Sequence, residues 1–140
     1  MPPDATALTA PDALQRLRSL PDTPVLPPHR EWVFCLEAQI GSPLVWIGKT
    51  QGPLREYLCS AQARCPVPLK LTALCSAPRG TKALLHAKFR AQRTHSEWFE
   101  LTSDLAEFIA ALPKGEPLAA ATLERWATDI RTTFGTIPIP

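Results

Sequence analysis

The sequence predicts an α+β fold in which helices flank a small three-stranded sheet, mixed or antiparallel. Three short runs rich in branched and aromatic residues have strand character, at 31–37, 44–47 and 69–76. Segments with helical spacing of apolar residues follow the second and third runs. This order, strand–strand–helix–strand–helix, is typical of helices that cover one small sheet.

A helix and a proline-rich linker precede the first strand. Pro11 to Leu20 has leucines at helical spacing, and proline is favoured in the first turn of a helix. Residues Pro21–Pro28 contain four prolines in eight positions, which indicates a stiff linker. We therefore assign residues 1–30 to an N-terminal extension.

The first two strands are expected to form a hairpin. Glu31–Glu37 and Leu44–Ile47 are separated by Ile40–Pro43, which contains Gly and Pro and predicts a turn. Gly48–Gly52 is expected to be a loop, and Pro53 opens a helix that runs to Gln62. The third strand is expected at Leu69–Ser76.

The second half of the chain is mostly helical. Arg79–Arg93 predicts one helix, Glu97–Leu101 a short extended segment, and Thr102 or Ser103 the cap of a helix that ends at Leu112. We assign residues 31–112 to the central domain and 113–140 to a C-terminal extension. That extension holds a helix from Leu118 to Phe134, opened by Pro117 and closed by Gly135, and an extended tail, Thr136–Pro140.

The last helix carries an apolar stripe that needs a surface to cover. Its members, at helical spacing, are Leu123, Trp126, Ala127, Ile130 and Phe134. A protein partner could provide that surface.

Composition excludes several classes of protein. No run of 18 or more apolar residues is present, so no membrane helix is expected. The first residues lack a basic segment followed by an apolar one, so we expect a cytoplasmic protein.

Cys35 and Cys75 lie in strand-like runs and predict buried free thiols. Cys59 and Cys65 have no zinc-ligand spacing, so no structural metal is expected.

Basic charge is concentrated in one block of the chain. Residues 44–96 hold nine Lys and Arg against one acid, a net charge of +8 in a chain whose total is +2. The forty residues between Glu56 and Glu97 contain no acid. Such a block is the electrostatic signature expected of a protein that binds a polyanion. Scattered solubilising charges are the alternative interpretation.

Several short motifs occur in an order that resembles a known family. They are Val33-Phe34-Cys35, Trp46-Ile47-Gly48-Lys49-Thr50, Arg55, Pro68-Leu69, His86-Ala-Lys-Phe89 and Glu97-Trp98-Phe99. Together, over roughly residues 32–112, they resemble the GIY-YIG endonuclease superfamily, in particular its phage and bacterial branch. The resemblance implies a three-stranded sheet flanked by helices, two strand tyrosines that act on a water, a phosphate-binding arginine, and a glutamate that binds a divalent metal.

The chain departs from that pattern at the positions that carry the chemistry. By the resemblance, Phe34 and Trp46 replace the two tyrosines, Arg55 is retained, and Lys82 replaces the metal-binding glutamate. Phenylalanine has no hydroxyl, and an ammonium group repels Mg²⁺. Glu37 and Glu56 are the nearest acids, and nothing in their spacing indicates a replacement metal site. We therefore expect no intact catalytic set and no cofactor; Mg²⁺ or Mn²⁺ would be needed only if the chain were an active nuclease.

The same departures fit a surface that binds phosphates. On one expected helix, a cationic or titratable stripe recurs at helical spacing and comprises Arg79, Lys82, His86, Arg90 and Arg93. Lys49 and Arg55 would extend it, and Trp46 could stack on a base or sugar. A solvated basic face, with Trp46 as a packing residue, is the alternative.

These observations lead to three hypotheses about function. The first is a nucleic-acid-binding protein of GIY-YIG-like fold that does not cleave DNA or RNA. The second is a protein-interaction subunit of a larger nucleic-acid-processing or defence assembly. The third is an active endonuclease with a non-standard site.

Overall fold

The computed structural model describes residues 9–38 and 43–134. The elements, in chain order, are α1 (Ala10–Arg18), β1 (Arg30–Ala38), β2 (Leu44–Thr50), α2 (Leu54–Ala63), β3 (Leu69–Pro78), α3 (Thr81–Lys88), a 3-10 turn (Arg90–Gln92), β4 (Arg93–His95), β5 (Trp98–Glu100), α4 (Ser103–Ala110), β6 (Lys114–Pro117) and α5 (Ala120–Phe134). The α+β class is therefore confirmed. The predictions for Gly135, the tail 136–140 and most of the turn Ile40–Pro43 lie outside the described residues.

The sheet has six strands, so the expected number of three is wrong. Its order is β4-β5-β2-β1-β3-β6, and the three expected strands form its centre. β1 pairs antiparallel with β2 and β3, whereas β6 pairs parallel with β3. The additional strand Lys114–Pro117 is polar and exposed. Backbone pairing rather than side-chain propensity therefore holds it in the sheet.

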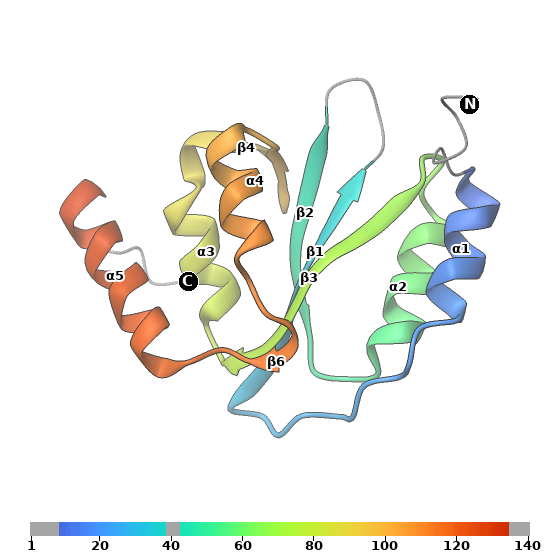
Figure 1. The fold of residues 1–140 in the computed structure, drawn as a ribbon, viewed down its shortest axis with the longest axis horizontal. Coiled ribbons are helices and arrows are strands. Elements are labelled where there is room, and N and C mark those ends of the chain that lie inside the picture. Colours follow the sequence, from blue (N-terminus) through green and yellow to red (C-terminus); the bar gives the residue numbers. More distant parts are fainter. Residues whose placement is uncertain (1–8, 39–42, 135–140) are drawn as a thin grey trace.

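Helices cover both faces of the sheet (Figure 1). α1 and α2 lie on one face, over a core that includes Leu17, Phe34 and Leu58. α3, α4 and α5 lie on the other, over a core that includes Ile47 and Leu85. Alternating residues of β1 supply both cores, as expected for a strand that is buried on both faces. None of the described helices combines the length and the hydropathy that a membrane span requires.

The helix expected over Arg79–Arg93 is shorter than predicted. α3 ends at Lys88, a single 3-10 turn follows, and Arg93–His95 forms β4. β4 pairs antiparallel with β5, which itself pairs with β2. The chain must therefore leave the helix early and reverse direction to bring β5 to the sheet. Ser96 makes that reversal with a positive φ of 50°.

The proline-rich linker is attached to the sheet rather than free of it. Leu26 N–H donates to Gln51 O at 2.8 Å, and Trp32 Nε1 donates to Pro24 O at 2.9 Å. Thr23 Oγ1 accepts from Leu54 N, the first residue of α2. These bonds hold the linker along the end of the sheet where β1 begins.

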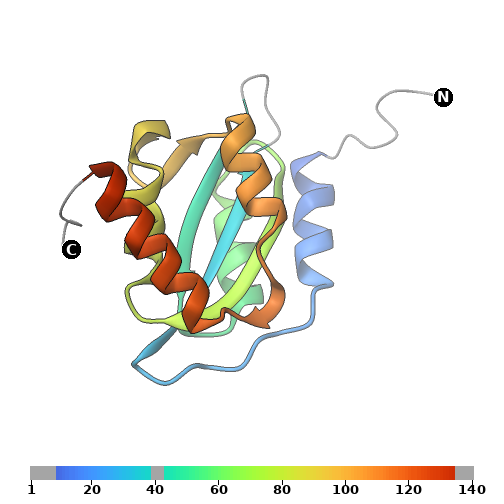
Figure 2. The same cartoon turned by 60° about the vertical axis from the view of Figure 1, so that its left-hand side comes forward.

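Two residues of the apolar stripe on the last helix, Trp126 and Ile130, are covered within the chain. Trp126 and Ile130 are 5% and 1% exposed. The Trp126 ring lies 4.9 Å from that of Phe108 on α4, and Asp129 pairs with Lys88 of α3 at 3.9 Å. Figure 2 shows α5 lying across α3. α3 and α4 therefore supply the surface for these residues, whereas the side chain of Phe134 lies outside the described residues.

Gly48 lies where β1 and β2 make a close approach. The loop expected at Gly48–Gly52 is wrong in its first half, because β2 continues to Thr50. Gly48 is opposite Phe34 in the β1–β2 register. A Cβ atom at Gly48 would lie 2.6 Å from Phe34 Cζ and 3.0 Å from Trp46 Nε1. The Phe34 ring thus occupies the space of a side chain.

We expect Gly48→Ala to lower the free energy of unfolding by roughly 1–3 kcal/mol, because the fully buried Phe34 ring has little room to move. Urea denaturation measures the effect. Gly52→Ala is the matched control, since a Cβ atom at Gly52 would have no heavy atom within 4 Å, and its unfolding should change by less than about 0.5 kcal/mol. Equal stability of the two variants would contradict the close approach.

Trp126→Ala should destabilise the protein by roughly 3–5 kcal/mol, because it removes a large buried ring between α5 and the core. The exposed neighbour Arg125 provides the control variant Arg125→Ala, which should be close to neutral. Chemical denaturation of both variants checks this. A neutral Trp126→Ala would mean that α5 does not pack on the sheet domain in solution.

Candidate functional site

Aromatic rings fill the space between the first two strands and α2. Phe34 is 0% exposed, and its ring centroid lies 5.8 Å from that of Trp46 and 5.4 Å from that of Tyr57. Trp46 also contacts Tyr57 and, across the β2–β5 pair, Trp98. Phe34 and Trp46, which stand where the family resemblance implies two tyrosines, therefore meet, but in a packed cluster and not around an open cleft.

Tyr57, and not Arg55, is the α2 residue that faces these strands. Arg55 points toward the linker, where its guanidinium donates to Leu20 O at 3.4 Å and pairs with Asp22 Oδ2 at 3.6 Å. Residues two apart on a helix point in nearly opposite directions. Arg55 on α2 therefore lies apart from the α3 side chains that it was expected to extend, and its binding of phosphate stays a prediction. Leu54, Tyr57 and Leu58 share one helix face, and that spacing could have identified Tyr57.

Lys82 meets Glu97, the acid at which the forty-residue interval without acids ends. The Lys82 ammonium forms an ion pair with Glu97 Oε2, and Trp46 Nε1 donates to Glu97 Oε1 at 2.9 Å. Burial alone would raise the pKa of Glu97, but the hydrogen bonds from Lys82 and Trp46 outweigh it, and its pKa is lowered. Glu97 is thus an ionised carboxylate with both oxygens bound. It is a poor general base.

Two further groups near this carboxylate are held in uncharged forms. Burial lowers the pKa of His86, whose Nε2 lies 2.9 Å from Ile47 O and whose ring packs edge-on against Phe99. Burial, reinforced by the charge of Glu97, raises the pKa of Tyr57. His86 is therefore a neutral structural residue at pH 7, and Tyr57 keeps its phenolic proton.

The residues present do not fit the divalent metal that the GIY-YIG resemblance implies. By the resemblance, Lys82 stands at the position of the metal-binding acid. Both carboxylate oxygens of Glu97 already have partners, because Oε2 pairs with Lys82 and Oε1 accepts from Trp46. Glu37 lines a cavity against α4 with Leu101 and Ala106, and Glu56 is exposed on α2. Within residues 9–38 and 43–134, no three His, Cys, Asp or Glu residues lie close enough to hold a metal together.

The cysteines are free thiols. Burial raises the pKa of Cys35 to about 12 and that of Cys75 to about 11, so both remain protonated. Cys59 and Cys65 are half-buried. The prediction that Cys35 and Cys75 belong to the core is confirmed.

The cationic stripe expected on one helix is divided among several elements. Lys82 and His86 lie on α3, whereas Arg79 precedes it, Arg90 lies in the 3-10 turn and Arg93 in β4. The Arg93 guanidinium donates to Ser96 O at 2.7 Å. The continuous stripe is therefore a wrong prediction, because α3 ends at Lys88.

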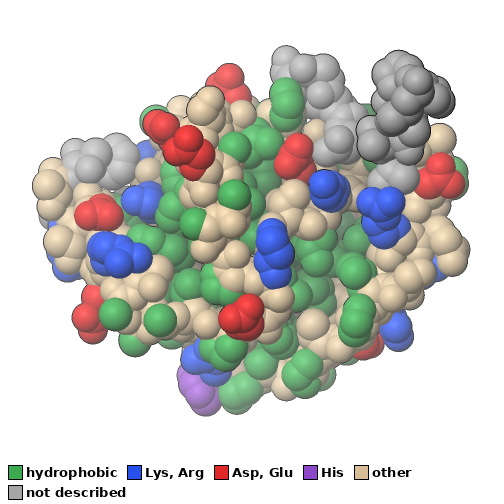
Figure 3. Space-filling view, viewed as in Figure 1, with side chains coloured by type: hydrophobic (Ala, Val, Ile, Leu, Met, Phe, Trp, Pro, Cys, Tyr) green, Lys and Arg blue, Asp and Glu red, His purple; other side chains and the backbone are tan. Residues whose placement is uncertain are grey.

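Four basic residues of the 44–96 block pair with acids from outside it. The pairs are Lys49–Glu31, Arg55–Asp22, Lys82–Glu97 and Lys88–Asp129. On the face drawn in Figure 3, Lys and Arg are interspersed with Asp and Glu. The charge asymmetry along the sequence is thus partly cancelled by the fold.

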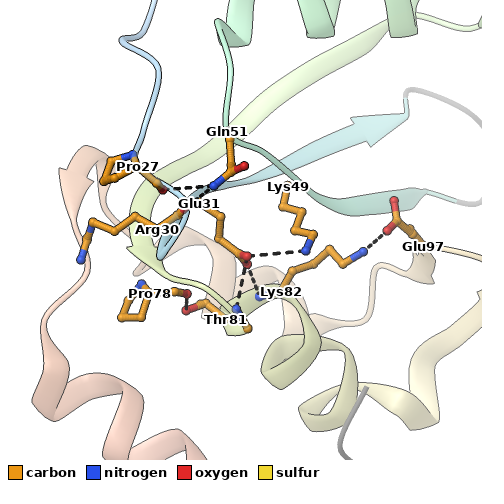
Figure 4. A network of polar contacts seen from close by, with 10 residues as sticks. Pro27, Arg30, Glu31, Lys49, Gln51, Pro78, Thr81, Lys82 and Glu97 are labelled. Atoms are coloured by element: carbon orange, nitrogen blue, oxygen red, sulfur yellow. Dashed lines mark hydrogen bonds and ion pairs between the residues drawn. The ribbon is translucent and has the colours of Figure 1, made fainter.

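Cations remain at one end of the sheet, around Glu31 (Figure 4). Glu31 is 2% exposed; it accepts from Gly80 N at 3.2 Å and Lys82 N at 2.9 Å, and lies 3.7 Å from Lys49 Nζ. A cavity of about 300 Å³ opens beside it. Its lining consists of Pro28, Arg30, Glu31, Lys49, Thr50, Gln51 and Arg79.

This cavity includes Lys49 and Arg79 from the predicted phosphate-binding set and adds Arg30, which sequence reasoning missed. The side chain of Arg30 runs to the opposite side of Glu31 from Lys49 (Figure 4). Its Nη2 donates to Ser76 Oγ at 3.4 Å. The signal that could have located this site is Glu31, an acid at the first position of the first expected strand.

Comparison of the chain with protein-family models, with curated proteins and with solved structures gave no match. The GIY-YIG resemblance therefore rests on the residues of this chain alone.

Proposed function

We propose that this chain is a nucleic-acid-binding protein on a GIY-YIG-like frame that does not cleave its ligand. The observation that carries the proposal is the pairing of Lys82 with Glu97 next to the cations around Glu31. The first feature removes the metal and base chemistry that phosphodiester hydrolysis uses. The second leaves positive charge at an accessible end of the sheet.

The absence of cleavage follows from several groups acting together. Phe34 supplies no hydroxyl, Trp46 donates its only polar hydrogen to Glu97, and Lys82 excludes a cation. The polar groups of Trp46 and Lys82 both bind Glu97. Such a mutually satisfied set has no free group to activate water.

Binding is supported by the cations that the fold does not neutralise. Arg79 is exposed, and its guanidinium has no partner in the described ranges. The Lys49 side chain is 44% exposed and makes only a long ion pair with Glu31. Lysine and arginine side chains in this state bind phosphates by releasing condensed counterions.

A role as a protein-interaction subunit of a larger nucleic-acid-processing or defence assembly has less support. Trp126 and Ile130, from the apolar stripe of α5 that motivated it, are buried within the chain. Binding of a protein partner through that helix stays a prediction.

The first expected outcome is weak, salt-dependent binding of DNA or RNA. The logarithm of the association constant should fall linearly with the logarithm of salt concentration, and Arg79→Ala should reduce the slope by about one. Fluorescence anisotropy measures this. Arg125→Ala, an exposed arginine on α5, should leave the slope unchanged. Binding that is absent, or insensitive to salt, would contradict the proposal.

The second expected outcome is that single- and double-stranded DNA and RNA remain uncut in Mg²⁺ or Mn²⁺. Gel electrophoresis of end-labelled substrates tests this. Glu97→Gln, purified in the same way, identifies any contaminating nuclease, because contaminant cleavage would persist in both samples. Cleavage by the wild-type chain that Glu97→Gln or Arg55→Ala abolishes would establish the active-nuclease hypothesis instead.

A further inference from the structure

The cavity beside Glu31 has more hydrogen-bond donors than acceptors. Both Glu31 oxygens are already bound, by Gly80 N and Lys82 N, and the carboxylate also faces the Lys49 ammonium. Both amide hydrogens of Gln51 are used as well, because its Nε2 donates to Pro27 O and Arg30 O. The carboxylate acceptors and the amide donors of the lining are therefore satisfied.

Three donor groups around the cavity still have capacity. Lys49 carries three ammonium hydrogens and makes one long ion pair. The Thr50 hydroxyl accepts from Gly52 N, which leaves its own hydrogen free to donate. The Arg79 guanidinium has no partner among the described residues. A cavity that offers donors but few acceptors is suited to an anion.

The charge of the lining indicates which anion. Arg30, Lys49 and Arg79 outweigh the single acid Glu31, so the lining side chains carry a net charge of +2. A phosphate monoester carries about −1.5 to −2 at pH 7, whereas each internal phosphate of a strand carries one negative charge. The cavity, at about 300 Å³, also lies at the lower limit of ligand pockets. Its net charge therefore matches a terminal phosphate better than an internal one, and its volume admits a small anion.

The cavity is rigidly built. Its floor is the buried Glu31 carboxylate, and its walls come from the end of β2, the start of β1 and the turn before α3. The backbone bonds Arg79 N–His29 O, at 2.9 Å, and Leu26 N–Gln51 O, at 2.8 Å, join those walls. A preformed site loses less entropy when it binds a ligand.

We propose that this cavity binds the terminal phosphate of a nucleic-acid strand, with Arg79, Lys49 and Thr50 as donors. The inference rests on the proposed function, since it assigns a specific group of that ligand to a specific site. It places strand ends, rather than continuous duplex, at the end of the sheet where β1 begins.

The test compares single-stranded DNA and RNA 12-mers that carry a 3′ fluorophore and either a 5′-phosphate or a 5′-hydroxyl. We expect the 5′-phosphorylated strand to bind the wild-type chain roughly tenfold more tightly, as one or two charge-assisted hydrogen bonds provide. Arg79→Ala should remove this preference, and Arg125→Ala should keep it. Lys49→Met is a second variant with the same expected loss, and circular dichroism checks that each variant folds.

Each outcome has a separate meaning. Equal binding of both strands by the wild-type chain overturns this inference while the proposed function stands. A phosphate preference that survives in folded Arg79→Ala and Lys49→Met also overturns it, because the preference then arises elsewhere. Failure of either strand to bind overturns the proposed function as well. Inorganic phosphate at millimolar concentration should compete with the 5′-phosphorylated strand. If phosphate weakens the binding of both strands equally, the result counts against the inference, because it indicates only that added salt screens the charges.

Discussion

The buried carboxylate of Glu31 is the constraint on which the central geometry depends. A charged group at 2% exposure is costly unless hydrogen bonds and counter-charges replace its water. The partners come from different elements: Lys49 from β2, and the backbone N–H groups of Gly80 and Lys82 from the start of α3. α3 has no side-chain cap from its own N-cap residue. Glu31 therefore acts as its cap from a distant part of the chain and matches the positive end of the helix dipole.

This cap determines where the Lys82 side chain lies. With its backbone N–H fixed on Glu31, Lys82 extends its side chain to Glu97 (Figure 4). Glu97 in turn accepts a hydrogen bond from Trp46 Nε1. Two lysines and two acids thus alternate in a row. They are Lys49 on β2, Glu31 on β1, Lys82 on α3 and Glu97 just before β5. Both acids lie outside the basic block 44–96. The fold therefore brings together opposite charges that are separate along the sequence.

Much of the central fold could be predicted from the sequence. The three central strands, α1, α2 and α4 follow from periodicity, branched residues and caps, such as Thr102, whose hydroxyl accepts from Leu105 N. The edge strands could not be predicted in this way. Lys114–Pro117 has no strand propensity, and its pairing with β3 depends on contacts remote in sequence.

The site was predictable only in part. Arg90, Gln92 and Arg93 favour a helix by local propensity, and the pairing of β4 with β5 overrides it. Phe34 and Trp46 were placed correctly on neighbouring strands. Whether they formed a cleft or a packed cluster depended on Tyr57 and Glu97, which approach from α2 and the start of β5. Helical spacing indicates that Tyr57 faces the sheet, but tertiary packing decides which rings it meets and where Glu97 lies.

The packing also means that one substitution would not create the catalytic centre that the GIY-YIG resemblance implies. Lys82→Glu would place a second carboxylate opposite Glu97, and two adjacent carboxylates raise the pKa of one of them unless a cation lies between. Even a bound cation would find no hydroxyl at Phe34, and Trp46 would still donate to Glu97. Tyr57 has the only phenolic group of the chain and is packed against both rings with its proton retained. In the proposed function, the lack of cleavage is thus a property of the whole cluster, and the cations around Glu31 are the part of the domain that we propose to face a ligand.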